Sequence, residues 1–198
     1  MNRKEFVQKS LQAGLGCCAL LAVKCAAAAE DAPKPAEDNT KFKFDKEFVQ
    51  NWLADLLDAM DAELDEKTRV KLIEYCGRAC FNRFQFKKDI AMQGKGDLQK
   101  LIAAYKKNFE IWQDGDLVHI RYGEVSNQCY CPAANYRPAK PHDLHCECTR
   151  TTHQTIFETA LGRPVKADVV ESLRRGGKTC HFVVDLAPGH GDEPTAPA

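Results

Sequence analysis

Cysteines are the residues of this sequence that are best suited to do chemistry, and most of them occur in closely spaced pairs. The chain of 198 residues contains 10 cysteines. The pairs are Cys76 with Cys80, Cys129 with Cys131, and Cys146 with Cys148. The first pair is spaced by four residues, so on a helix both thiols project from one face. The other two pairs follow a Cys-x-Cys pattern, so in an extended chain each pair also projects to one side.

Converging thiolates suit a metal ion, because sulfur atoms at about 2.3 Å can surround zinc tetrahedrally. We therefore predict a thiolate metal site, with zinc as the first candidate and an iron–sulfur cluster as the less favoured one. The predicted ligands are Cys129, Cys131, Cys146, Cys148 and Cys180, with Cys76 and Cys80 as additional candidate thiols. His145 and His153 lie close to the last Cys-x-Cys pair, and either is a candidate ligand or proton carrier.

Three other roles for the cysteines stay open. Export would permit disulfides, but seven cysteines follow the N-terminal segment, so at least one thiol would remain free. Cys180 by itself also fits a buried apolar role. The third alternative is a reactive thiol, with Cys76 and Cys80 as an exchanging pair that lacks the Cys-x-x-Cys spacing of thioredoxin-like sites.

The N-terminal segment, residues 1–29, predicts a cleaved export signal. Arg3 and Lys4 form a basic start. An apolar stretch, Leu11–Val23, and the small residues Ala26–Ala29 follow it. The start also resembles a twin-arginine signal in which lysine replaces the second arginine, and the general secretory route is the alternative. We expect a periplasmic or secreted protein without a stable membrane span after cleavage, because the apolar stretch is too short.

Charge and composition limit the kinds of partner. Lys+Arg and Asp+Glu both number 28, so the formal net charge is zero, which gives no electrostatic basis for binding nucleic acid. Residues 30–41 are polar and are expected to form a linker, and residues 188–198 a disordered tail. Residues 42–187 between them should form one cysteine-rich domain, whose oligomeric state the composition leaves open.

Apolar periodicity predicts helices in the first half of this domain and mostly strands in the second. The expected helices are residues 45–64, 66–84, a third helix after Gly96 and Asp97, and 149–161. The expected strands are residues 117–122, 128–131, 165–173 and 179–186. In the last strand, one face carries Cys180, Phe182, Val184 and Leu186 and should point into the core. The predicted fold class is α+β, with N-terminal helices packed on a small, mainly antiparallel sheet.

We expect Cys76 and Cys80 to face the sheet and to lie near the Cys-x-Cys segments. Both belong to one helical stripe with Val70 and Ile73, the face that a helix normally buries. Gly77 between them has no side chain, so it would let another segment approach the helix closely. The alternative is that both cysteines merely fill core volume.

The stretch from Cys146 to Leu186 resembles a known group of proteins. Its sequence, CECTRTTHQTIFETALGRPVKADVVESLRRGGKTCHFVVDL, is similar to the end of four-vinyl-reductase-type ligand-binding domains and of aminothiazoline-carboxylate hydrolase-like families. CGRAC at Cys76 and CYCP at Cys129 fit exported cysteine-rich relatives. The resemblance implies an α+β fold with a small-molecule pocket and, in sensor members, a structural zinc. Cys180 matches the last zinc-binding cysteine of those sensors, whereas Ser172 replaces another.

Two classes of function follow from these patterns. The first is an exported binding module that ligates zinc through thiolates and holds a small molecule. The second is an enzyme that hydrolyses a small C–N or C–S ring, as the hydrolase resemblance implies, with His145 or His153 as proton carrier. Tyr122, Tyr130 and Trp112 are candidates to line a ligand pocket, although aromatic residues near strands are more often core.

Overall fold

A computed structural model of the chain describes residues 39–188. The predicted export signal, most of the predicted linker and residues 189–198 of the predicted tail lie outside the described residues. Met1–Phe44 and Asp45–Ala198 form two separate units, and of the first unit only the opening residues of one helix are described. Within residues 39–188, no helix is both long enough and apolar enough to cross a membrane.

Five α-helices occur in the described part of the chain. They are α3 (Asn39–Glu63), α4 (Glu66–Arg83), α5 (Gln85–Gln93), α6 (Leu98–Tyr105) and α7 (Glu147–Leu161). Their ends follow local capping chemistry. The Asp65 carboxylate accepts a hydrogen bond from the Thr68 backbone N–H at 3.0 Å and begins α4. Gly162 adopts a left-handed conformation with φ 67°, which ends α7 as the sequence predicted.

Four strands form one antiparallel sheet in the order β1-β2-β4-β3. The strands are β1 (Glu110–Asp114), β2 (Leu117–Arg121), β3 (Lys166–Glu171) and β4 (His181–Asp185). Val118 and Ile120 of β2 are fully buried on the face that Phe182 and Val184 of β4 share. The predicted α+β fold with N-terminal helices and an antiparallel sheet is therefore confirmed, and so is the buried face of the last strand.

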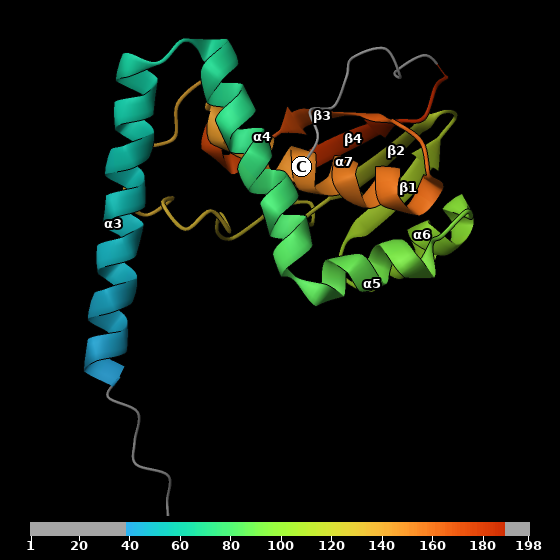
Figure 1. Cartoon of the computed structure of the whole chain (residues 1–198), viewed down its shortest axis with the longest axis horizontal. Coiled ribbons are helices and arrows are strands. Elements are labelled where there is room, and N and C mark those ends of the chain that lie inside the picture. Colours follow the sequence, from blue (N-terminus) through green and yellow to red (C-terminus); the bar gives the residue numbers. More distant parts are fainter. Residues whose placement is uncertain (1–38, 189–198) are drawn as a thin grey trace, which may run out of the picture. The chain divides into compact units, whose positions relative to one another are not determined.

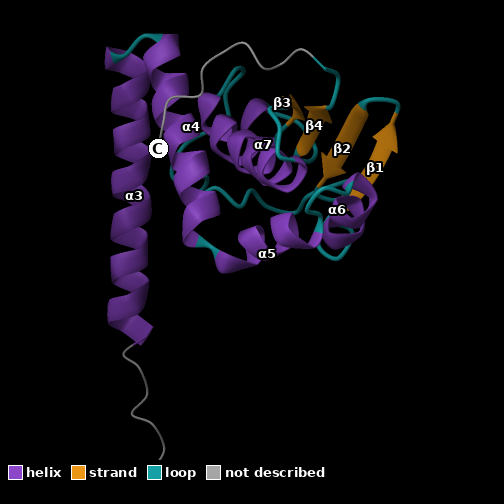
Figure 2. Cartoon of the chain, turned by 45° about the vertical axis from the view of Figure 1, so that its right-hand side comes forward, coloured by secondary structure: helices purple, strands orange, loops and turns teal. Residues whose placement is uncertain are grey.

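Helix α7 joins the sheet to the other helices (Figure 1). It packs on β3 and β4, and on its other sides it contacts α4 and α5, while α6 packs on β1. Figure 2 shows α7 lying between the strands and α4. The main core contains Leu101, Tyr105, Ile120, Phe157 and Val184, which come from α6, β2, α7 and β4. Helix α7 therefore contacts both the sheet and the helices that lie beside it.

The structure differs from the predicted elements in five places. Helix α3 begins at Asn39 instead of residue 45, and α5 and β1 were not predicted. The segment 128–131 is irregular and not a strand. Cys146 and Cys148 do not lie in extended chain, because a 3₁₀ turn, Leu144–Cys146, leads directly into α7. The Asp143 carboxylate begins that turn by accepting the His145 backbone N–H at 2.9 Å.

Candidate functional site

A cavity of about 1030 Å³ lies among α4, α5, α7, the ends of β2 and β4, and the irregular segment around residue 130. Its wall contains eight thiol and imidazole side chains. They are Cys80, Cys129, Cys131, Cys146, Cys148, Cys180, His145 and His153. The five cysteines predicted as metal ligands thus all reach one cavity, together with both predicted histidines. Tyr122 and Tyr130 also line it, whereas Trp112 stacks on His119 with ring centroids 4.8 Å apart.

The prediction that α4 buries both Cys76 and Cys80 is wrong for Cys76. The buried line of this helix is Ile73, Gly77 and Phe81. Cys76 is exposed, and Cys80 is half-buried beside the cavity. The helix packs mainly on α7 and not on the sheet, so its buried line passes through the residue with the least volume, which is Gly77. Cys76 lies about 100° around the helix from that line and so faces solvent.

Cys129, Cys131 and His145 form a compact group at one end of the cavity. The Cys131 backbone N–H donates to Cys129 Sγ at 3.4 Å, and Cys131 Sγ lies 3.0 Å from His145 Nδ1. The hydrogen bond from the Cys131 thiol lowers the pKa of Cys129 to about 6, and the positive charge of Arg174 adds to this effect. The same thiol contact raises the pKa of Cys131. Burial lowers the pKa of His145 to about 4, so its imidazole is neutral at pH 7.

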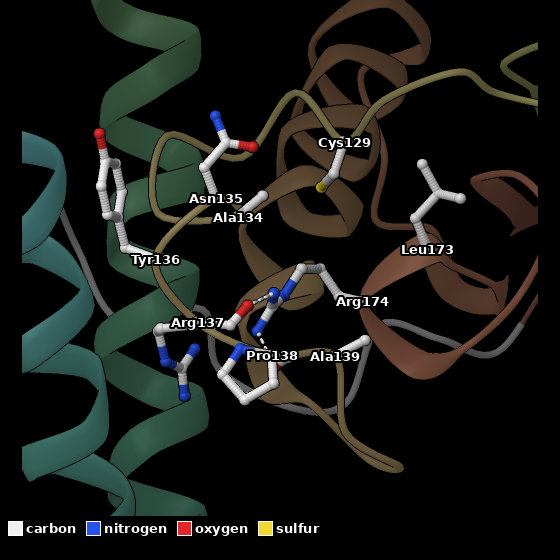
Figure 3. A pocket seen from close by; sticks show the side chains of 9 residues that line it. All are labelled: Cys129, Ala134, Asn135, Tyr136, Arg137, Pro138, Ala139, Leu173 and Arg174. Atoms are coloured by element: carbon white, nitrogen blue, oxygen red, sulfur yellow. Dashed lines mark hydrogen bonds between the residues drawn. The ribbon is translucent and has the colours of Figure 1, made fainter. Parts of the chain in front are cut away.

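Arg174 fixes the loop that follows Cys131. Its guanidinium donates to the carbonyl oxygens of Arg137 at 2.6 Å and Pro138 at 2.9 Å, and it pairs with the Asp143 carboxylate at 2.6 Å. Arg174 and Asp143 are only 3% and 1% exposed, so the ion pair is buried. Arg174 and Cys129 also line a second hollow of about 480 Å³ beside this loop (Figure 3). Cys129 therefore borders both spaces.

The remaining cavity cysteines lie in α4, in the 3₁₀ turn before α7, in α7 and directly before β4, and they are held in different ways. The Cys146 thiol donates to Ser172 Oγ at 3.0 Å, and burial raises its pKa to about 12. Burial also raises the pKa of Cys148 to about 11. Lys87 Nζ donates to Cys80 Sγ at 2.9 Å at the edge of the cavity. All seven cysteines of the described residues are free thiols.

His153 lies deep in the cavity wall between two tyrosines. Its Nδ1 is 3.2 Å from the Tyr105 hydroxyl, and its Nε2 is 3.0 Å from the Tyr122 hydroxyl. Burial lowers the pKa of His153 to about 3, which keeps the imidazole neutral at pH 7. Sequence reasoning missed Tyr105 because it fell on the apolar face of its helix and was counted as core. No local sequence pattern indicates that Tyr105 lies beside His153, because 48 residues separate the two.

The donors in the cavity are of the kind that zinc prefers, but they are spread along its wall. Among residues 39–188, no group of three or more His, Cys, Asp or Glu side chains is arranged so that it could hold a metal ion. No protein-family model and no curated protein matches the chain. The resemblance to four-vinyl-reductase-type domains and to the hydrolase-like families therefore stays a prediction.

Proposed function

We propose that this domain binds a small, mainly apolar molecule in its thiol-lined cavity. The observation that carries the proposal is the cavity itself, which has a volume of about 1030 Å³. Ligand pockets of proteins measure roughly 300–1,000 Å³ and combine apolar walls with a few polar groups. The proposed setting is the periplasm or the exterior of the cell, as the N-terminal sequence predicts.

The wall of the cavity has the composition that such a ligand requires. Aromatic and aliphatic side chains from five elements or their ends form most of it, among them Phe84, Ile90, Phe109, Ile156 and Phe182. Thiols add further surface that is polarizable and only weakly polar. Burial of an apolar ligand against these side chains would contribute roughly 25 cal/mol for each Å² removed from water.

A tryptophan that fills the cavity tests the proposal. Thr149 of α7 is half-buried in the cavity wall, and Thr159 of the same helix is exposed and outside it. We expect 2-isopropylnaphthalene to bind the full chain in equilibrium dialysis. Thr149→Trp should weaken that binding at least about tenfold, which corresponds to roughly 1.4 kcal/mol. Thr159→Trp should leave it unchanged. Equal binding by both variants would place the ligand elsewhere, and no binding to the wild type would refute the proposal.

A second candidate function is thiolate metal binding, and the contact between Cys131 and His145 favours it. Two soft donors already touch, and the Cys129 thiol adjoins them with a pKa lowered to about 6. A shift of these three side chains would be needed before they could share one ion. Zinc bound there would replace the thiol protons, since the thiolate is the ligand form.

Metal analysis of the chain purified without a histidine tag tests this second candidate. We expect close to one zinc per chain, lost in Cys131→Ala and retained in Cys76→Ala, whose side chain is exposed and outside the cavity. Protein that contains no metal and takes up none from a zinc buffer would refute it.

A further inference from the structure

Tyr105, His153 and Tyr122 form a continuous hydrogen-bonded chain that ends at the cavity. Tyr105 is the last residue of α6, His153 lies in α7, and Tyr122 directly follows β2. The distances along the chain are 3.2 Å from the Tyr105 hydroxyl to Nδ1 and 3.0 Å from Nε2 to the Tyr122 hydroxyl. All three residues contribute to the cavity wall.

Burial fixes the direction of the hydrogen bonds in this chain. Tyr105 is 0% exposed, and His153 Nδ1 is the hydrogen-bond partner of its hydroxyl within residues 39–188. A buried O–H group that donates to nothing is strongly disfavoured, so Tyr105 must donate to Nδ1. A neutral imidazole carries a single proton, and the lowered pKa of His153 keeps it neutral. We therefore assign that proton to Nε2, which donates it to the Tyr122 oxygen.

This direction leaves one hydroxyl proton without a protein acceptor. Because Tyr122 receives a hydrogen bond from His153, its own O–H is free to donate, and no described side chain or carbonyl accepts it. Tyr122 is half-buried, with its ring stacked on Phe109 at a centroid distance of 4.7 Å and tilted against Phe182 at 5.8 Å. The two rings hold the phenol in place, so the free O–H belongs to a fixed group in the cavity wall. Two successive hydrogen bonds toward Tyr122 also polarise its O–H and strengthen it as a donor.

We infer that the Tyr122 hydroxyl donates a hydrogen bond to a carbonyl oxygen of the ligand. The chemical class of the ligand is then an apolar body, aromatic or aliphatic, that carries a neutral carbonyl group such as a ketone, an ester or an amide. A neutral acceptor suits the site because both the imidazole and the two phenols that lead to it are uncharged. This inference rests on the proposed ligand-binding function and adds the group that the cavity recognises.

Two ligands of nearly equal shape separate the carbonyl contact from apolar binding. The ketone 2-acetylnaphthalene and the hydrocarbon 2-isopropylnaphthalene differ mainly in the oxygen. In equilibrium dialysis with the full chain, Tyr122→Phe should weaken ketone binding about 3- to 10-fold and leave hydrocarbon binding within about 2-fold. The infrared carbonyl stretch of the bound ketone should lie at lower frequency in the wild type than in Tyr122→Phe, because a hydrogen bond weakens the C=O bond.

The assigned direction of the hydrogen bonds from Tyr105 through His153 to Tyr122 can be tested separately. Nitrogen NMR of the wild-type chain should show His153 with a protonated Nε2 and an unprotonated Nδ1, and Tyr105→Phe should remove that preference. The inference is overturned if Tyr122→Phe affects ketone and hydrocarbon equally, if the carbonyl stretch does not change, or if Nδ1 carries the proton. Failure of both compounds to bind the wild type would instead refute the proposed ligand-binding function, and the inference with it.

Discussion

The carbonyl oxygen of Cys148 lies against the backbone of Gly77, so closely that a Cβ atom on Gly77 would be 2.5 Å from it. The side chain of Thr151, one turn further along α7, would be 2.7 Å away. Helices α4 and α7 therefore meet at the single residue of α4 that has no side chain. This close approach brings Cys80 and Cys148 to the same cavity.

Replacement of Gly77 by alanine should destabilise the protein despite the better helix propensity of alanine. Alanine favours a helix over glycine by about 1 kcal/mol, but the clash with the backbone of α7 would force the helices apart at a cost of roughly 1–3 kcal/mol or more. We expect a net loss in the free energy of unfolding, measured with urea, and weaker binding in the cavity. Cys76→Ala, at the exposed neighbouring position, should change stability by less than about 0.5 kcal/mol. A Gly77→Ala variant as stable as the wild type would contradict the close packing.

The buried pair of Arg174 and Asp143 should be far more important for stability than an exposed ion pair. Arg174→Met leaves the Asp143 carboxylate buried without its main partner, and we expect a loss of about 3–5 kcal/mol in the free energy of unfolding. The matched control is Arg121→Met, which breaks the pair of Arg121 and Glu110 at 2.6 Å, where both side chains are at least one-third exposed. That change should cost less than about 1 kcal/mol. Similar losses of stability in the two variants would show that the loop after Cys131 does not depend on Arg174.

Cys129 should be the most reactive thiol of the cavity near neutral pH. Its pKa of about 6 makes it largely a thiolate at pH 7, whereas Cys146 and Cys148, with pKa values of about 12 and 11, stay protonated. The rate of alkylation by iodoacetamide, followed by peptide mass spectrometry, should rise with a midpoint near pH 6 at Cys129. Cys131→Ala removes the main hydrogen bond to that thiolate and should move the midpoint toward the ordinary thiol pKa of 9.0. A midpoint unaffected by Cys131→Ala would show that the Cys131 hydrogen bond does not lower the pKa of Cys129. The exposed thiol of Cys76 serves as the internal control for alkylation.

The two cavity histidines should make the fold sensitive to mild acid. In the folded protein His153 and His145 have pKa values of about 3 and 4, below the ordinary 6.5, so between these values the unfolded chain binds more protons. Their contribution to stability is therefore complete above pH 6.5 and is lost as the pH falls, by roughly 1.4 kcal/mol per pH unit for each histidine.

Urea unfolding between about pH 6.5 and 4.5 measures this dependence. His145→Asn should reduce the slope by up to about 1.4 kcal/mol per pH unit, because it removes one of the histidines whose pKa is lowered by burial. His142→Asn changes an exposed histidine with φ 60°, a conformation that asparagine tolerates, and should leave the slope as in the wild type. An equal slope in His145→Asn and the wild type would mean that His145 is not shielded from water.

Local patterns were sufficient for most of the fold. Alternating apolar residues placed Val118 and Ile120 on the buried face of β2, and Gly162 ended α7 where expected. Helix α5 and strand β1 were not predicted, because their sequences are short and mostly polar on the outside. Strand β1 buries only Ile111. The segment around Cys129 resembles a strand locally, but it has no strand partner within the described residues, and Arg174 instead holds the loop that follows it through the Arg137 carbonyl.

The sequence by itself determined that the cysteines come in pairs, that the pairs flank an α+β core, and that Gly77 permits a close approach. Spacing fixes which thiols share a side of one element, because helix and strand periods are local properties of the backbone. Only the tertiary structure decided which pairs meet. The packing of α7 on α4 turned Cys80 toward the cavity and Cys76 toward solvent, and it placed His153 between two tyrosines from distant segments. Such contacts depend on how helices pack across long sequence separations, and no short stretch of sequence specifies that packing.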